Sequence, residues 1–304
     1  MPGSAIDPAS AVVVDLFHLT LILGVVGVAV FWVVREVAPL WRWQAHGNVF
    51  TGTLGGGDLV VAGGIVAFYY FSVTAAAGVT APPGEVGGAM AGLGDRAVMI
   101  VAQTVLLQVF FASLLGFYLG YLRRIDLGEF FGLRRLGGKK LALWSIGGLV
   151  VCYVVVVVAA LAGQALLARA GLDAELQVPV EMLLEAGPVP LKVLLVLAAV
   201  VGAPLMEEVV FRGFLYPVMK RHSERFFAAV FTAAVFALAH QNLGSVLPLF
   251  ALGLLFAAAF ELSGSLVLPM VLHGLFNGSQ IVLVFLAGGE LDALGAAGWI
   301  FGGG

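Results

Sequence analysis

The chain has 304 residues and a formal net charge of −3; 61% of the residues are hydrophobic and only 11% are charged. Soluble globular domains are usually about half apolar and about a quarter charged, so this composition, with a mean hydropathy of +1.07, excludes an ordinary soluble domain. The single cysteine, Cys152, excludes a disulfide framework within one chain and a thiolate metal cluster.

The apolar residues fall into eight stretches, each a candidate transmembrane helix, because a bilayer core about 30 Å thick needs roughly 20 apolar residues. In chain order they are residues 12–34, 59–79, 97–122, 141–168, 191–219, 226–241, 246–262 and 265–287. The run at 147–167 does not alternate in polarity, which argues against barrel strands. No Lys or Arg precedes the first stretch, so we expect a retained helix and not a signal peptide. The predicted fold class is an all-α polytopic membrane protein with about eight transmembrane helices and a membrane-embedded catalytic cavity.

Lys and Arg in the loops predict the orientation. They concentrate in segments 35–58, 123–140 and 220–225, whereas 169–190 is acidic. The basic segments are therefore expected in the cytoplasm and both chain ends outside, in the cell membrane. Segment 173–187 is expected to lie at the outer interface and 80–94 to form an outer loop. Membrane lipid is the expected partner of the basic cluster, and nothing indicates nucleic-acid binding.

Charged side chains inside apolar spans cost roughly 2.5–3.5 kcal/mol each, so their default interpretation is functional. The fifth span contains Glu207, Glu208 and Arg212. Glu208 and Arg212 are four residues apart on a helix and can pair. Glu207 points about 100° away, without that partner. An apolar setting would then suit Glu207 to act as a general base near neutral pH.

Two histidines lie in later spans, each in a pair spaced four residues apart: Phe236 with His240, and His273 with Asn277. Counted along their helices, Glu207, His240 and His273 lie roughly 18, 21 and 12 Å from the cytoplasmic face, so they can share one site. We hypothesise that Glu207 and His240 hold and deprotonate a water that attacks a peptide carbonyl. His273 and Asn277 would donate hydrogen bonds to the oxyanion.

In order along the chain, these motifs resemble those of the CAAX-protease and bacteriocin-processing family, also called the Abi or type II CAAX prenyl endopeptidase family. The motifs are Glu207-Glu208-x-x-x-Arg212, Phe236-x-x-x-His240 and His273-x-x-x-Asn277. The string Phe131-Gly-Leu-Arg134 before the fourth span resembles the family's lead-in. The resemblance covers roughly residues 130–287.

This resemblance implies a metal-independent endopeptidase without a cofactor, with its site open to the cytoplasm. Its substrates would be membrane-associated proteins or peptides, including prenylated CAAX tails. Glu207, His240, His273 and Asn277 would be catalytic. Supporting roles would fall to Glu208, Arg212 and Phe236. The expected organisation is a set of about three N-terminal helices (1–130), a CAAX-protease-like domain (131–287) and a short tail (288–304).

Two alternatives stay open at this point. Glu207, His240 and His273 also make up a His₂Glu set, which is a known catalytic zinc arrangement, although no HExxH motif is present. Embedded Glu, His and Arg also mark proton relays and transport paths, so a transporter or a scaffold that binds membrane peptides is the second alternative. A transporter often shows paired halves with broken helices, and no such symmetry is visible in the sequence.

Overall fold

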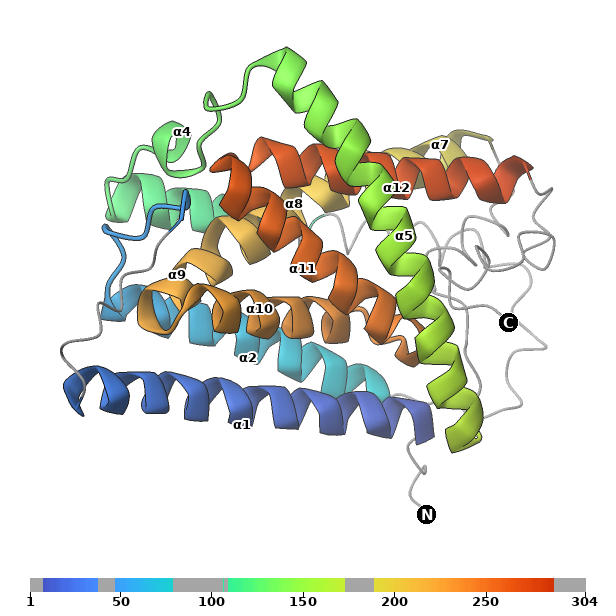
Figure 1. Cartoon of the computed structure of the whole chain (residues 1–304), viewed down its shortest axis with the longest axis horizontal. Helices are drawn as coiled ribbons and strands as arrows, with labels where there is room; N and C mark the ends of the chain where they lie inside the picture. The colour runs from blue at the N-terminus through green and yellow to red at the C-terminus, as the bar shows by residue number, and fades with distance from the viewer. Residues whose placement is uncertain (1–7, 38–46, 79–105, 107–108, 173–188, 287–304) are drawn as a thin grey trace.

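The computed structural model describes residues 8–37, 47–78, 106, 109–172 and 189–286, and the regular elements within these ranges are helices (Figure 1). The predicted outer loop at 80–94, the predicted interfacial segment at 173–187 and the tail at 288–304 lie outside the described residues. The helices that position the site are α1 (Pro8–Val37), α2 (Gly56–Gly78), α4 (Leu127–Phe130), α5 (Gly138–Ala170), α7 (Val189–Leu197), α8 (Ala203–Val210), α9 (Tyr216–His222), α10 (Arg225–Ala239), α11 (Val246–Ser263) and α12 (Val267–Leu286).

Eight apolar helices in the described part of the chain correspond to the eight predicted spans. Five are long and apolar enough to cross a membrane: Pro8–Val33, Gly138–Ala170, Val189–His222, Leu243–Ser263 and Val267–Leu286. Three are shorter: Gly56–Ser72, Val109–Leu122 and Arg225–Ala239. The all-α polytopic membrane fold class is therefore confirmed.

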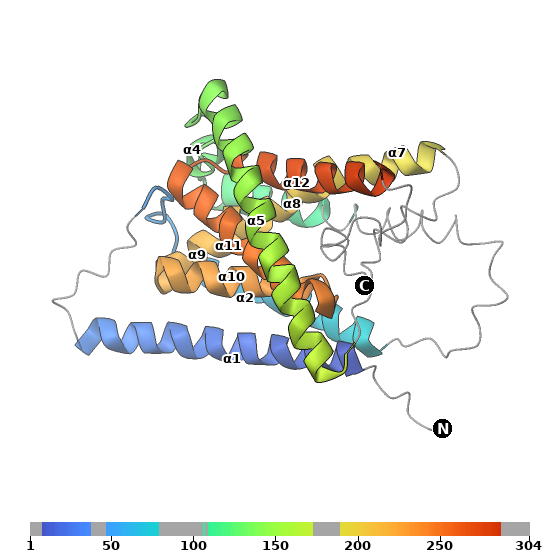
Figure 2. The same ribbon diagram turned by 45° about the vertical axis from the view of Figure 1, so that its right-hand side comes forward.

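Large apolar side chains are exposed along α1 and α5, for example Val25 at 72% and Leu143 at 70%. Soluble proteins rarely expose so much contiguous apolar surface, whereas a lipid-facing helix requires it. In Figures 1 and 2, α1 runs along the lower edge of the bundle and α5 crosses it in front. Helix α5 packs on α11, α11 packs on α10, and α10 packs on α1. The outer faces of α1 and α5 are thus suited to lipid, and the inner helices carry the polar chemistry.

Small residues allow the helices at the centre to approach closely, as is usual in membrane bundles. A side chain added at Gly24 or Gly27 of α1 would collide with the Phe231 or Phe227 ring of α10. One hydrophobic cluster then runs from Phe17 of α1 to residues of α9, α10 and α11. The N-terminal helices share this core with the predicted 131–287 domain, and the boundary near residue 130 stays a prediction.

The helical stretch Val189–His222 contains two widened, π-helical turns, η3 (Ala198–Gly202) and η4 (Phe211–Leu215). Each is followed by a proline at the second position of the next helix: Pro204 and Pro217. Proline lacks an N–H and its ring crowds the carbonyl four residues earlier, so the preceding turn widens. Helix α8, which carries Glu207 and Glu208, therefore lies between two widened turns of the same helical stretch.

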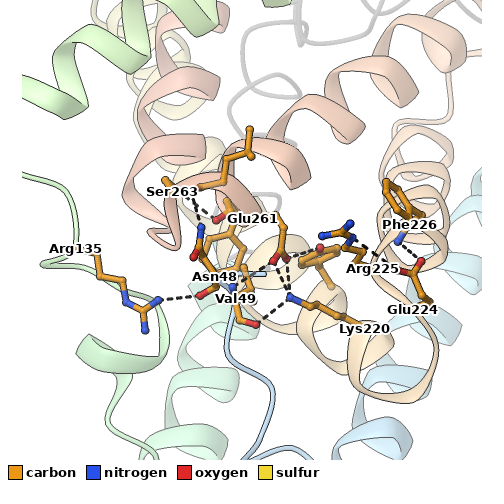
Figure 3. A network of polar contacts seen from close by, with 12 residues as sticks. Asn48, Val49, Arg135, Lys220, Glu224, Arg225, Phe226, Glu261 and Ser263 are labelled. Carbon is orange, nitrogen blue, oxygen red and sulfur yellow. Dashed lines mark hydrogen bonds and ion pairs between the residues drawn. The ribbon is translucent and has the colours of Figure 1, made fainter. Parts of the chain in front are cut away.

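The basic segments meet at one end of the bundle, around residues 47–58. Arg123 pairs with the fully buried Asp58 at 3.0 Å, and Arg135 donates to the Asn48 carbonyl at 2.8 Å. Figure 3 shows Lys220 within this region. Its ammonium group binds both carboxylate oxygens of Glu261 at 2.8 and 2.9 Å. Counting Lys220 as a loop charge was wrong, because this side chain is completely buried in α9.

The same network fastens the segment before α2 to the helical core. Lys220 also donates to the Val49 carbonyl at 3.1 Å, and the Tyr216 hydroxyl donates to Glu261 at 2.7 Å. Nearby, the turn after α4 docks on the turn between α11 and α12: Leu266 donates its N–H to the Phe131 carbonyl at 2.8 Å. Gly132 in that turn has φ +62°, which favours glycine, and a Cβ there would also collide with the backbone of Gly264.

Candidate active site

Glu208 of α8 is fully buried, and its Oε1 accepts a hydrogen bond from Arg212 Nη1 at 2.9 Å. The predicted pairing of these two residues is confirmed. Arg212 is 1% exposed and directs its second terminal nitrogen to the Gly253 carbonyl of α11 at 3.1 Å. The Arg212 guanidinium therefore joins α8 to α11. Arginine suits this role because the N–H donors of its planar guanidinium form a rigid fork.

Aromatic rings enclose the Arg212 guanidinium on several sides. Its central carbon lies 4.5 Å from the centroid of Phe236 on α10 and 5.2 Å from that of Phe256 on α11. A cation over an aromatic face is attracted by the ring quadrupole, most strongly where water is excluded. The rings thus offset part of the cost of burying the charge.

His273 of α12 faces both carboxylates. Its Nδ1 lies 3.0 Å from Glu208 Oε1, and its Nε2 lies 3.9 Å from Glu207 Oε2. Glu208 Oε1 already accepts from Arg212, so the hydrogen between that oxygen and the histidine belongs to Nδ1. The ring, 4% exposed, also stacks on Phe256 with a centroid separation of 4.9 Å. Its orientation is therefore fixed, with Nε2 turned toward Glu207.

His240 occupies the C-terminal cap of α10 and is held differently. Its Nδ1 lies 2.7 Å from the Phe236 carbonyl, one turn earlier in the same helix. A carbonyl can only accept, so Nδ1 carries the hydrogen of this bond, and the other ring nitrogen, Nε2, takes no part in it. The Phe236 ring lies edge-on to both His240 and His273, at 4.8 and 6.0 Å. It joins the two histidines across α10 and α12.

Asn277 lies on α12 one turn beyond His273, but its amide is engaged elsewhere. Its Nδ2 donates to the Ala199 carbonyl of η3 at 2.9 Å. Next to this contact a Cβ at Gly274 would lie 2.7 Å from the Val200 carbonyl oxygen, so glycine lets α12 approach the wide turn. Asn277 thus satisfies a backbone carbonyl of η3, and the second hydrogen of its amide is not used in this bond.

The structure brings Glu207, Glu208, Arg212 and His273 together directly, and His240 joins them through Phe236. The sequence analysis missed Phe256 and Gly253, which contribute the stacking ring and the carbonyl on α11. Their spacing of three residues places them on one face of α11. This spacing was the feature of the sequence that could have identified them. Among the described residues, no group of three or more His, Cys, Asp or Glu side chains is arranged to hold a metal ion, so the set weighed for zinc does not form such a group.

Residues 189–279 match the family model described as type II CAAX prenyl endopeptidase Rce1-like. This segment is therefore similar to that family. It contains all seven predicted site residues, from Glu207 to Asn277. The match confirms the resemblance inferred from the three motifs, and it covers the CAAX prenyl endopeptidase-like segment from residue 189 to residue 279. No curated protein and no solved structure matches the chain.

Proposed function

We propose that this chain is an intramembrane endopeptidase that hydrolyses a peptide bond in a membrane-associated substrate, using a water activated by Glu207 and His240. The observation that carries the proposal is the group of two carboxylates and a histidine, joined across α8 and α12 within the CAAX prenyl endopeptidase-like segment. Prenylated CAAX-type peptides are the substrate class to test first, because the matched family is named for them.

In the first step the water oxygen attacks the peptide carbonyl carbon, and the water gives up one proton to Glu207. The Nε2 lone pair of neutral His240 accepts a hydrogen bond from the same water. Collapse of the tetrahedral intermediate breaks the carbon–nitrogen bond, and the proton held by Glu207 passes to the leaving amine. The products are a carboxylic acid and an amine. A base aligned with its water contributes roughly 10²–10⁴-fold to the rate.

The oxyanion of the intermediate requires hydrogen-bond donors. His273 supplies one from Nε2 if its ring is doubly protonated, because Nδ1 already donates to Glu208. The carboxylates of Glu207 and Glu208 flank this ring and are the opposite charges that stabilise an imidazolium. Asn277 supplies the second donor from the amide hydrogen that is not bonded to Ala199. Glu208 and Arg212 support the site by orienting His273.

The test is cleavage of a panel of membrane-anchored and prenylated peptides by the purified full chain, with and without a chelator. The variants are Glu207→Gln, which keeps the shape of the side chain but removes the base, and Glu129→Gln, which changes an exposed carboxylate on α4. We expect cleavage by the wild type and Glu129→Gln, a loss of at least about 100-fold with Glu207→Gln, and no chelator effect.

Undiminished cleavage by Glu207→Gln would contradict the role of this carboxylate. Loss of activity with the chelator, restored by zinc, would favour the metal-dependent alternative. Proton flux through liposomes that contain the protein but no peptide would favour the transport alternative.

A further inference from the structure

Tyr69 of α2 lies beside the site although it comes from outside the CAAX prenyl endopeptidase-like segment. Its ring packs on Phe211 of η4 with centroids 5.3 Å apart. The backbone N–H of Phe211 bonds the Glu207 carbonyl, so Phe211 lies one helical turn beyond Glu207. The Tyr69 phenol is also within electrostatic range of the Glu207 carboxylate. Tyr69 thus adds a polar group from the N-terminal helices to the surroundings of Glu207.

Aromatic contacts continue from Tyr69 into the centre of the site. Phe211 lies edge-on to Phe236 at 5.2 Å, and Phe236 contacts both histidine rings. Phe211 and Phe236 are almost completely buried, which limits how far the Tyr69 ring can move away from α8. The Tyr69 ring is therefore held beside Phe211 of η4 by packing that does not depend on substrate.

The next residue, Tyr70, has a different environment. Its hydroxyl lies 2.6 Å from His18 Nε2 of α1, and its ring contacts Phe17 and His18. Neighbouring residues of a helix point about 100° apart, so the two tyrosines serve different neighbours. Tyr69 packs on the residue one turn beyond Glu207, whereas Tyr70 contacts α1, so Tyr70 provides a control within the same turn.

We propose that Tyr69 is a positioning residue for Glu207: its hydroxyl donates a hydrogen bond to the Glu207 carboxylate when substrate is bound. A hydrogen bond to the charged form of a carboxylate favours that form. The bond would keep Glu207 ionised and directed at the water. The inference rests on the proposed function. It gives α2, which lies outside the matched segment, a part in the reaction.

The experiment compares Tyr69→Phe with Tyr70→Phe in the purified full chain, on a peptide that the wild type cleaves. We expect Tyr69→Phe to lower kcat roughly 10-fold or more with little change in KM, while Tyr70→Phe retains the wild-type kcat. Loss of the donor favours protonated Glu207 in the enzyme–substrate complex, so the acid side of the pH profile of kcat should move to higher pH with Tyr69→Phe alone. Thermal unfolding of both variants in detergent checks that the fold is kept.

A kcat and a pH profile for Tyr69→Phe that match those of Tyr70→Phe would overturn the inference while leaving the proposed function intact. A lower kcat without a shift in the pH profile would also overturn it, because that is the result of a purely structural role. If no peptide is cleaved in a manner that Glu207→Gln abolishes, the proposed function fails, and the inference fails with it.

Discussion

Replacing Arg212 by Met should destabilise the protein strongly, because it leaves the Glu208 carboxylate buried without its cation. The two side chains are 1% and 0% exposed and are joined at 2.9 Å. Opposite charges about 4 Å apart attract by about 4 kcal/mol at an effective dielectric constant near 20. Removal of one partner from a buried pair typically costs about 3–5 kcal/mol. We expect Arg212→Met to lose about 4 kcal/mol of unfolding free energy, including the bond to Gly253.

The decisive comparison is the double variant Arg212→Met/Glu208→Gln. It buries no isolated charge, and the glutamine oxygen can still accept from His273. We therefore expect the double variant to be at least as stable as Arg212→Met alone. The control is Arg225→Met, which removes an exposed cation 3.8 Å from Glu224 and should cost less than about 1 kcal/mol.

The assay is denaturant-induced unfolding of the purified proteins in detergent micelles, followed by circular dichroism. A loss below about 1 kcal/mol for Arg212→Met would refute the reasoning, since the carboxylate would then have another source of stabilisation. Strictly additive losses in the double variant would refute it as well, because residues in direct contact normally couple.

Three further variants test the packing around the site by the same unfolding assay. Gly253→Ala should cost about 1–3 kcal/mol, because the new Cβ would lie 2.9 Å from a side-chain carbon of α10; a neutral result would mean that α10 and α11 separate easily. Gly274→Ala should cost a similar amount by forcing α12 off the Val200 carbonyl, and unchanged stability would argue against that close contact. Lys220→Met should cost about 3 kcal/mol by leaving Glu261 without its cation, and an unchanged free energy of unfolding would contradict this.

The helices were predictable from the sequence because membrane thickness directly sets the length of an apolar run. The same holds for pairs within one helix: Glu208 with Arg212, and Phe236 beside His240, follow from the helical repeat alone. The motif residues were found because charged and imidazole side chains are rare in apolar spans. The helical repeat and the apolar environment of the membrane were sufficient to predict these features.

Contacts between helices were beyond such reasoning. The buried pair of Lys220 and Glu261 joins residues 41 positions apart, and loop-charge counting treats any lysine near a span end as exposed. The wide turn η3 was missed because the span at 191–219 was read as continuous, although Pro204 inside it was the available signal. Asn277 was expected as an oxyanion donor, and its carbonyl partner on another helix could not be predicted, since the bond to Ala199 exists only because α12 packs on that turn.

The two histidines depend on the fold to different degrees. The Nδ1 of His240 is satisfied by the Phe236 carbonyl of its own helix, so its tautomer is set by local structure. The Nδ1 of His273 is satisfied by Glu208 across the α8–α12 interface, so its orientation depends on long-range packing. Loosening that interface should disturb oxyanion stabilisation before it disturbs water activation. The proline-widened turn before α8, against which α12 packs through Gly274, is therefore as much a part of the candidate active site as the side chains that carry the charges.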